Sequence, residues 1–192
     1  EAEKGQRPLI FYSNGTHTEL WDDCRAGPRE VQGFYTRAEL ELAIQRRSLQ
    51  TDLREVPINS EIVERAYQHR AVRAMTESLS QGHRAGLLTM ATGTGKTRMS
   101  IALIELLMRG NWVKRVLFLA DRVALVNQAV NAFKSYLPDS APVNLVTEKN
   151  TEGRVFLSTY PTMMGLIDEA KDGQRRFGVG HFDLIVIDEA HR

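Results

Sequence analysis

Apolar runs alternate with helix-like stretches from about residue 61 to the end of the chain. Strands are expected at 86–90 (GLLTM), 115–120 (RVLFLA), 143–146 (VNLV), 155–159 (VFLST) and 183–187 (DLIVI). Most of these runs are continuously apolar instead of alternating, which is typical of strands buried on both faces. Helices are expected at 61–81, 97–109, 123–136 and after Pro161. We therefore predict an α/β fold, a parallel sheet with helices on both sides.

A β-hairpin is predicted near the start of the chain. Residues 9–13 and 16–21 are β-prone, and they flank Asn14-Gly15, a pair that suits a type I′ turn. The charges, the proline and the two glycines of 22–33 are typical of a loop.

A helix and then a domain boundary are expected next. Thr36 and Glu39 have the spacing of a capping box, at the start of a helix that ends near Ser48. Residues 51–60 include a proline and have no periodicity, as in a linker. The predicted organisation is a small α+β segment at 1–50, a linker at 51–60 and an α/β lobe at 61–192.

Composition and charge exclude several classes of protein. The 192 residues are 42% apolar and 26% charged, which rules out disordered and collagen-like chains. A net charge of +1 gives no global attraction to nucleic acid or an anionic membrane, so a nucleic-acid site must be local. One cysteine excludes an intrachain disulfide, and no run is long enough for a membrane helix. We expect a cytoplasmic protein without a membrane partner, cut from a longer chain.

The segment Met90–Thr97 (MATGTGKT) has the parts of a phosphate-binding loop. It follows an expected strand and opens an expected helix, although Met90 stands where the general pattern has glycine. Glycines let backbone amides point at an anion, the lysine reaches the outer phosphates and the hydroxyl after it can bind Mg²⁺. The expected nucleotide-binding residues here are Thr92, Gly93, Thr94, Gly95, Lys96 and Thr97.

A second acidic motif follows the last expected strand. Asp188 and Glu189 come directly after LIVI, so they are expected at the carboxyl edge of the sheet, where the phosphate loop also lies. There Asp188 can hold Mg²⁺ together with Thr97, and Glu189 can activate the attacking water. The expected catalytic residues are Lys96, Asp188 and Glu189.

These motifs resemble those of superfamily 2 helicases and translocases of the DEAH type. ATGTGKT and VIDEAHR are similar to the family's first and second motifs, and residues 116–128 and 157–163 resemble its DNA-contacting elements. The resemblance implies a RecA-like lobe, and it implies that Arg65 and Gln68, in Arg-Ala-Tyr-Gln, bind adenine. It also makes Arg122 and Thr159 candidates for contacts with DNA phosphates.

Within this superfamily the sequences of the motifs are most similar to those of the motor subunit of type I restriction–modification enzymes. The first segment resembles the end of that subunit's nuclease domain, whose metal-binding acids would lie upstream, so Glu19, Asp22 and Asp23 are interpreted as a solvated hairpin end. The resemblance implies ATP and Mg²⁺ as cofactors. It implies double-stranded DNA, specificity and methylation subunits, and a second RecA-like lobe as partners.

Two other functions stay open from the sequence. One is a DEAH-type DNA or RNA helicase outside restriction systems, and the other is an ATP-sensing assembly switch in which hydrolysis is incidental. Because the second lobe would supply an arginine to the reaction, we expect this chain alone to hydrolyse ATP negligibly.

Overall fold

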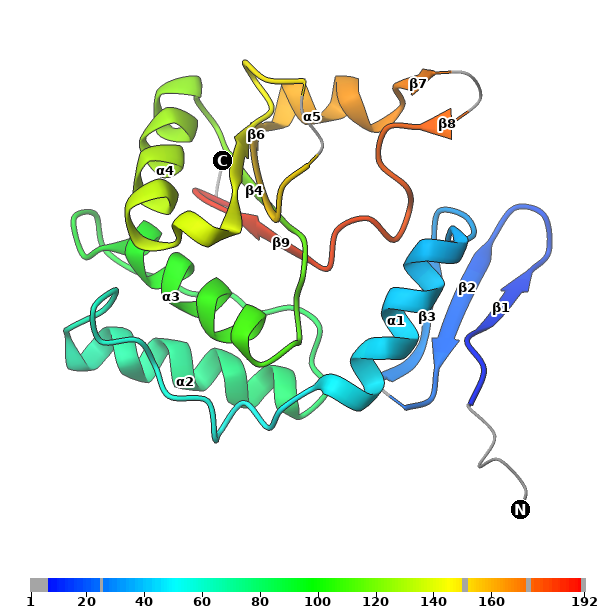
Figure 1. Ribbon diagram of the computed structural model, residues 1–192, viewed down its shortest axis with the longest axis horizontal. Helices are drawn as coiled ribbons and strands as arrows, with labels where there is room; N and C mark the ends of the chain where they lie inside the picture. Colours follow the sequence, from blue (N-terminus) through cyan, green and yellow to red (C-terminus); the bar gives the residue numbers. More distant parts are fainter. Residues whose placement is uncertain (1–6, 25, 150–151, 172–173, 191–192) are drawn as a thin grey trace. The chain divides into compact units, whose positions relative to one another are not determined.

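A computed structural model describes residues 7–24, 26–149, 152–171 and 174–190 (Figure 1). The chain divides into two compact units. The first comprises Glu1–Leu49 with Gly178–His181, and the second comprises Gln50–Phe177 with Phe182–Arg192. Among the described residues, no helix has the length and apolar character needed to span a lipid bilayer.

The first unit is a three-stranded antiparallel sheet with one helix. Its strands β1 (Ile10–Ser13), β2 (Thr18–Asp22) and β3 (Ala26–Val31) lie in the order β1-β2-β3, followed by α1 (Arg37–Leu49). The hairpin is confirmed, and so is the capping box: the Thr36 amide donates to Glu39 at 2.8 Å and the Glu39 amide to the Thr36 hydroxyl at 3.3 Å.

Two expectations in this unit are wrong. The predicted loop over 22–33 contains the edge strand β3, in which Gly27 and Pro28 lie where the pairing with β2 shifts register. A bulge at an edge accommodates both residues, because neither has to complete the ladder. Asp22 is not a solvated acid either: it accepts from Arg47 Nη2 at 2.7 Å in a largely buried ion pair.

The second unit is built on a parallel sheet, as predicted. Its strands are β4 (Val116–Ala120), β5 (Pro142–Asn144), β6 (Val155–Thr159) and β9 (Leu184–Ile187). They lie in the order β5-β6-β4-β9, and each neighbouring pair is parallel. The central strands β4 and β6 are buried along their whole length, which explains their continuous apolar runs.

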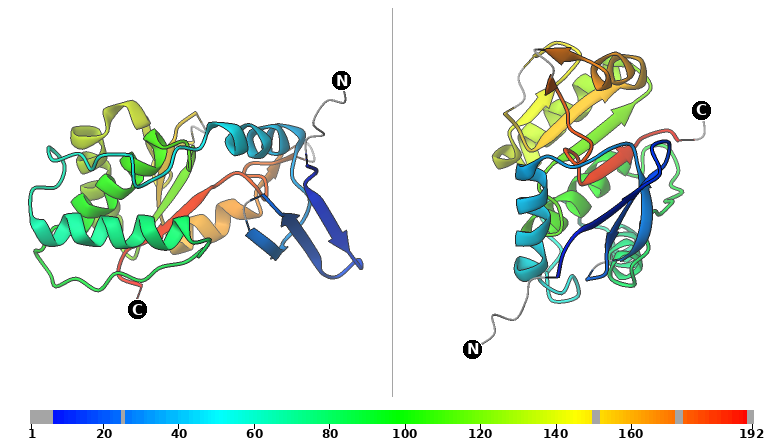
Figure 2. Two further views of the ribbon diagram at one scale, coloured as in Figure 1. Left: turned by 90° about the horizontal axis from the view of Figure 1, so that it is seen from below. Right: turned by 90° about the vertical axis from the view of Figure 1, so that its right-hand side faces the viewer.

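Helices cover both faces of this sheet (Figures 1 and 2). One core joins it to α2 (Ala66–Ser80), α3 (Lys96–Arg109) and α4 (Val123–Tyr136), with the rings of Phe118 and Phe133 5.8 Å apart. On the other face α5 (Tyr160–Ile167) inserts Met163 into a core around Phe156 and Phe177. Two short elements complete the unit, the 3₁₀ helix η1 (Pro138–Ser140) and the pair β7 (Ala170–Lys171) and β8 (Gln174–Arg175).

The segment before the phosphate loop differs from the prediction. Residues 86–90 form no strand, and Leu87 is 81% exposed, although Leu88 and Met90 pack against the core. No strand of the described sheet pairs with this segment, and the sheet ends at β9. An apolar run becomes a strand only where a neighbouring backbone can bond to it.

The predicted linker packs onto the second unit, and the helix that follows it starts later than predicted. Residues 51–60 pack within the second unit, where Leu53 and Val56 are buried and Arg73 donates to both of their carbonyls at 2.9 Å. Helix α2 begins at Ala66 instead of 61, since Ile62 and Val63 are buried in a turn that bonds to Asn59.

Candidate nucleotide-binding site

The glycines of the phosphate loop adopt the conformation that the sequence required of them. Gly93 and Gly95 have φ of 78° and 85°, in the left-handed region that favours glycine. Gly95 is the N-cap of α3, and its carbonyl accepts from the Met99 amide at 2.9 Å. Lys96 is thus the first residue of a 14-residue helix, and the free amides of the first turn can face an anion.

The acidic motif lies at the carboxyl end of β9, as expected. The Asp188 amide donates to the Leu119 carbonyl at 2.8 Å, which extends the pairing of β9 with β4 past the end of the strand. The chain then turns at Glu189, whose φ of 57° is unusual for a residue with a side chain. This turn brings the Glu189 carboxylate back toward the phosphate loop.

Lys96 and Glu189 meet across 93 positions of sequence. Lys96 Nζ lies 2.8 Å from Glu189 Oε1, and both side chains are roughly a quarter exposed. The hydrogen bond that Lys96 donates to the Glu189 carboxylate raises the pKa of Lys96 above its ordinary value. The structure therefore brings two of the three predicted catalytic side chains into contact.

Asp188 is the third of these side chains, and its surroundings disfavour its charge. Burial raises the pKa of Asp188, and the charges of Glu189 and Asp121 raise it further, whereas Lys96 opposes the shift. A carboxylate in this position is stabilised by a cation. Its oxygen and the Thr97 hydroxyl are the hard donors that Mg²⁺ prefers, so the site fits that ion.

The predicted adenine-binding residues lie at the start of α2, beside the phosphate loop. Gln68 is buried; its Oε1 accepts from the Arg65 amide at 3.3 Å and its Nε2 donates to the Thr94 carbonyl at 3.1 Å. In this conformation the Gln68 amide binds protein backbone on both sides. Arg65 Nη1 donates to the Tyr67 hydroxyl at 3.2 Å.

Tyr67 is a site residue that the sequence analysis did not select. Its hydroxyl donates to the same Thr94 carbonyl at 2.7 Å. The only signal in the sequence was its place next to Gln68, because the loop that it touches lies 27 positions away. Asp121 was also missed: it follows β4 and its charge acts on Asp188.

Comparison with known proteins identifies the family. A family profile described as "Type III restriction enzyme, res subunit" matches residues 61–192. The chain belongs to this family. Its res-subunit region begins where regular alternation of helices and strands was predicted, and it contains the phosphate loop and the acidic motif.

Two relatives of this chain come from Escherichia coli. It is 37% identical over 142 residues to "Type I restriction enzyme EcoKI endonuclease subunit" of strain K12, covering 71% of this chain and 12% of that protein. It is 36% identical over 130 residues to "Type I restriction enzyme EcoAI endonuclease subunit", covering 67% and 16%. These relatives confirm the resemblance to type I restriction subunits.

A solved structure agrees with the fold of the res-family chain. The fragment is described as an HsdR subunit of a type I restriction enzyme from Vibrio vulnificus YJ016, and it aligns with a TM-score of 0.52 and 26% identity. The alignment covers 95% of this chain and 33% of that chain. The chain therefore spans a third of this neighbour and less than a fifth of the two E. coli proteins.

The two predicted DNA-contacting residues of the res-family chain differ in accessibility. The Arg122 side chain is 69% exposed at the start of α4 and lies 3.4 Å from Asp121. Thr159 is only 6% exposed, and its hydroxyl accepts from the Thr162 amide at 3.4 Å as the N-cap of α5. Its hydroxyl caps this helix, so the contact of Thr159 with DNA stays a prediction.

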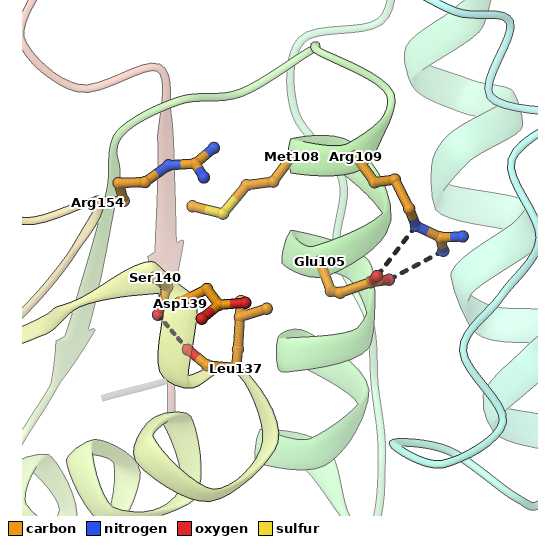
Figure 3. Close-up of a pocket in the computed structure, with 7 residues that line it drawn as sticks. All are labelled: Glu105, Met108, Arg109, Leu137, Asp139, Ser140 and Arg154. Atoms are coloured by element: carbon orange, nitrogen blue, oxygen red, sulfur yellow. Dashed lines mark hydrogen bonds and ion pairs between the residues drawn. The ribbon is translucent and has the colours of Figure 1, made fainter.

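A cavity of about 180 Å³ lies elsewhere in the res-family region (Figure 3). It is lined from α3 by Glu105, Met108 and Arg109, and from η1 and its neighbours by Leu137, Asp139, Ser140 and Arg154. These residues lie at the last turn of α3, after the end of α4 and just before β6, whereas the phosphate loop lies at the start of α3. Ligand pockets usually measure about 300 Å³ or more, so this cavity is not the nucleotide site.

Proposed function

We propose that the chain is the first ATP-binding motor lobe of a type I restriction endonuclease subunit, which moves double-stranded DNA by hydrolysing ATP. The observation that carries the proposal is the contact between Lys96 and Glu189. It joins a phosphate-binding loop at the start of α3 to an acidic pair at the end of β9, on one edge of a parallel sheet. Ligands bind at this edge in open α/β sheets.

Each residue of the site has a role in this reaction. The amides of 93–97 and the Lys96 ammonium bind the phosphates, and Thr97 and Asp188 hold Mg²⁺, which neutralises charge on the phosphates when bound. Glu189 orients the attacking water and accepts its proton. A bound phosphate competes with Glu189 for Lys96, so nucleotide binding itself releases the carboxylate for this role.

Arg65 and Gln68 are the adenine-binding residues of the proposal. Their place beside the phosphate loop supports it, because base and phosphates of one nucleotide must be reached together. To bind adenine, the Gln68 amide has to leave the Thr94 carbonyl.

The proposal extends to the parts of the protein outside this lobe. We assign 1–50 to the end of a nuclease-like domain, 51–60 to the connection and 61–192 to the first RecA-like lobe. A second RecA-like lobe supplies the arginine that stabilises the transition state, and specificity and methylation subunits select the DNA sequence. Arg122 contacts a DNA phosphate in the assembled enzyme.

The test uses variants of the intact protein. Lys96→Ala should lose ATP binding, measured by calorimetry, whereas Glu189→Gln should bind ATP and yet fail to displace a triplex-forming oligonucleotide from duplex DNA. Wild-type binding of ATP by Lys96→Ala would overturn the proposal. Unwinding of duplex DNA into single strands would favour a helicase. An ATP-sensing switch would be favoured if the wild type does not translocate on DNA and Glu189→Gln still assembles with its partners as the wild type does.

A further inference from the structure

Two side chains of α2 donate to one carbonyl of the phosphate loop. The Thr94 oxygen accepts from the Tyr67 hydroxyl at 2.7 Å and from Gln68 Nε2 at 3.1 Å. A carbonyl oxygen has two lone pairs, so both of its acceptor sites are used. The loop is thus tied to α2 immediately before Gly95, the N-cap of α3.

The same contact leaves no space for a side chain at Gly95 unless Gln68 moves. A Cβ placed on Gly95 would lie 2.7 Å from Gln68 Nε2, whereas one on Gly93 would meet nothing within 4 Å. The left-handed backbone of Gly95, with φ of 85°, aims the following amides. Any group that fixes Thr94 therefore fixes the direction of the amides that face the phosphates.

The two donors cannot both keep this role when a nucleotide binds. The proposed function requires Gln68 to turn its amide toward the base, which breaks its bond to Thr94. Tyr67 has a single polar group, the hydroxyl, which bonds to the loop. Arg65 Nη1 donates to that oxygen at 3.2 Å, so the hydroxyl hydrogen is left to point at Thr94.

We propose that Tyr67 is a positioning residue that holds the phosphate loop through the Thr94 carbonyl, so that Gln68 can leave this carbonyl to bind the base. The inference rests on the proposed nucleotide-binding function. In this proposal the two adjacent residues have different roles. Tyr67 acts on phosphate binding with any base, and Gln68 acts on the choice of base.

The first experiment compares Tyr67→Phe with the wild type in the intact protein. We expect dissociation constants for ATP, GTP and ADP to rise by the same factor, about three- to tenfold, the loss typical of one hydrogen bond. The ratio of ATP to GTP affinity should stay unchanged. Steady-state ATPase should show KM raised by a similar factor and kcat within about twofold. The matched control is Tyr136→Phe, which keeps the ring that stacks under Arg98 in α3 and should bind as the wild type does.

The second experiment uses inorganic tripolyphosphate, a probe without a base. Tyr67→Phe should weaken its binding by a smaller factor than it weakens that of ATP, because without a base Gln68 keeps its bond to the Thr94 carbonyl. Gln68→Ala should bind it within about twofold of the wild type, because Tyr67 keeps its own bond, while losing the preference for ATP over GTP. In Tyr67→Phe/Gln68→Ala the loss should exceed the product of the single effects, because the Thr94 carbonyl then has neither donor. Melting temperatures within a few degrees of wild type establish that the variants are folded.

The outcomes separate this inference from the proposed function. Wild-type affinity of Tyr67→Phe for ATP and tripolyphosphate, in a protein that loses both with Lys96→Ala, would overturn the role of Tyr67 and leave the function intact. A change in base preference in Tyr67→Phe would also overturn it. Failure of the wild type itself to bind ATP would overturn the function on which the inference rests.

Discussion

At the scale of single residues, the site concentrates groups that are costly in the absence of a ligand. Asp188 is partly buried beside two other acids, Glu189 has a left-handed backbone, and a side chain at Gly95 would meet Gln68. Such features cluster where function requires them, since each one alone destabilises the fold. Their effects on stability can be measured residue by residue.

Removing the charge of Asp188 should stabilise the protein without metal. Because burial raises its pKa, the folded protein binds the Asp188 proton more tightly than the unfolded chain does. Above the raised pKa the charged carboxylate therefore lowers the free energy of unfolding. This destabilisation disappears as the pH falls through the pKa and the carboxylate is protonated. Asp188→Asn should melt at a higher temperature than the wild type at about pH 8, and the two should converge by about pH 4.

The control for this experiment is Asp168→Asn, which removes a carboxylate at the exposed end of α5, away from the site. Adding Mg²⁺ and ATP should reverse the order, since only the wild type keeps the carboxylate that holds the ion. A lower melting temperature of Asp188→Asn at pH 8 would contradict the prediction.

The two loop glycines offer a matched pair. Both have positive φ, but only at Gly95 would a Cβ meet another group, Gln68 Nε2. Gly93→Ala should cost about 1–2 kcal/mol for the left-handed backbone alone. Gly95→Ala should cost more, because in the protein without nucleotide Gln68 must also give up its bond to the Thr94 carbonyl, and it should weaken ATP binding, because the left-handed backbone of Gly95 aims the following amides. Chemical denaturation and calorimetry measure the two effects, and equal losses of stability would contradict the contact.

At the scale of elements, the position of β9 beside β4 depends on one carboxylate. Asp183 Oδ2 accepts from the amides of Lys114 and Arg115, each at 2.8 Å, and the Asp183 amide donates back to the Arg115 carbonyl at 2.9 Å. These bonds align the starts of the two strands. The register then places Ile187 opposite Leu119 and the acidic motif at the carboxyl edge.

Loss of this carboxylate should weaken the second unit. Asp183→Ala leaves two amides without their acceptor and should lower the free energy of unfolding by about 1–3 kcal/mol in urea titrations. Asp183→Asn keeps one oxygen that can accept both bonds and should lose less. Equal destabilisation by the two substitutions would show that charge, and not the pair of hydrogen bonds, stabilises the strand starts.

At the scale of the whole molecule, the sheet has an apolar edge at β9. In the part of the chain that the structure describes, β9 pairs with β4 alone, and Ile185 and Ile187 are 55% and 45% exposed. Leu87, in the extended segment before the phosphate loop, is 81% exposed. Exposed strand edges with apolar side chains pair readily with other chains.

We therefore expect the isolated 192-residue chain to self-associate through β9. Ile185→Lys should reduce the associated fraction in light scattering, because a charge on an edge strand opposes pairing. Met164→Lys is the control: Met164 is also exposed and apolar, but it lies on α5, whose backbone bonds are made within the helix. Equal effects of the two substitutions would indicate general hydrophobic association instead.

The sequence alone predicted those elements whose pattern lies within a few neighbouring residues. The capping box of α1, the bounds of α4 and β6, and the chemistry of the phosphate loop and acidic motif follow from patterns that need no distant partner. The parallel direction of the strands was also predictable from the sequence, because continuously apolar strands joined by helices form a parallel sheet that is covered on both faces.

Tertiary structure decided whatever depended on a partner distant in sequence. β3 became a strand because β2 lies beside it, whereas the more apolar segment 86–90 did not, because the described sheet gives it no neighbour. Thr159 became a helix cap, and Tyr67 became part of the site through a carbonyl 27 positions away. Sequence specifies the chemistry of a side chain, but only the folded backbone sets which donors and acceptors it can reach.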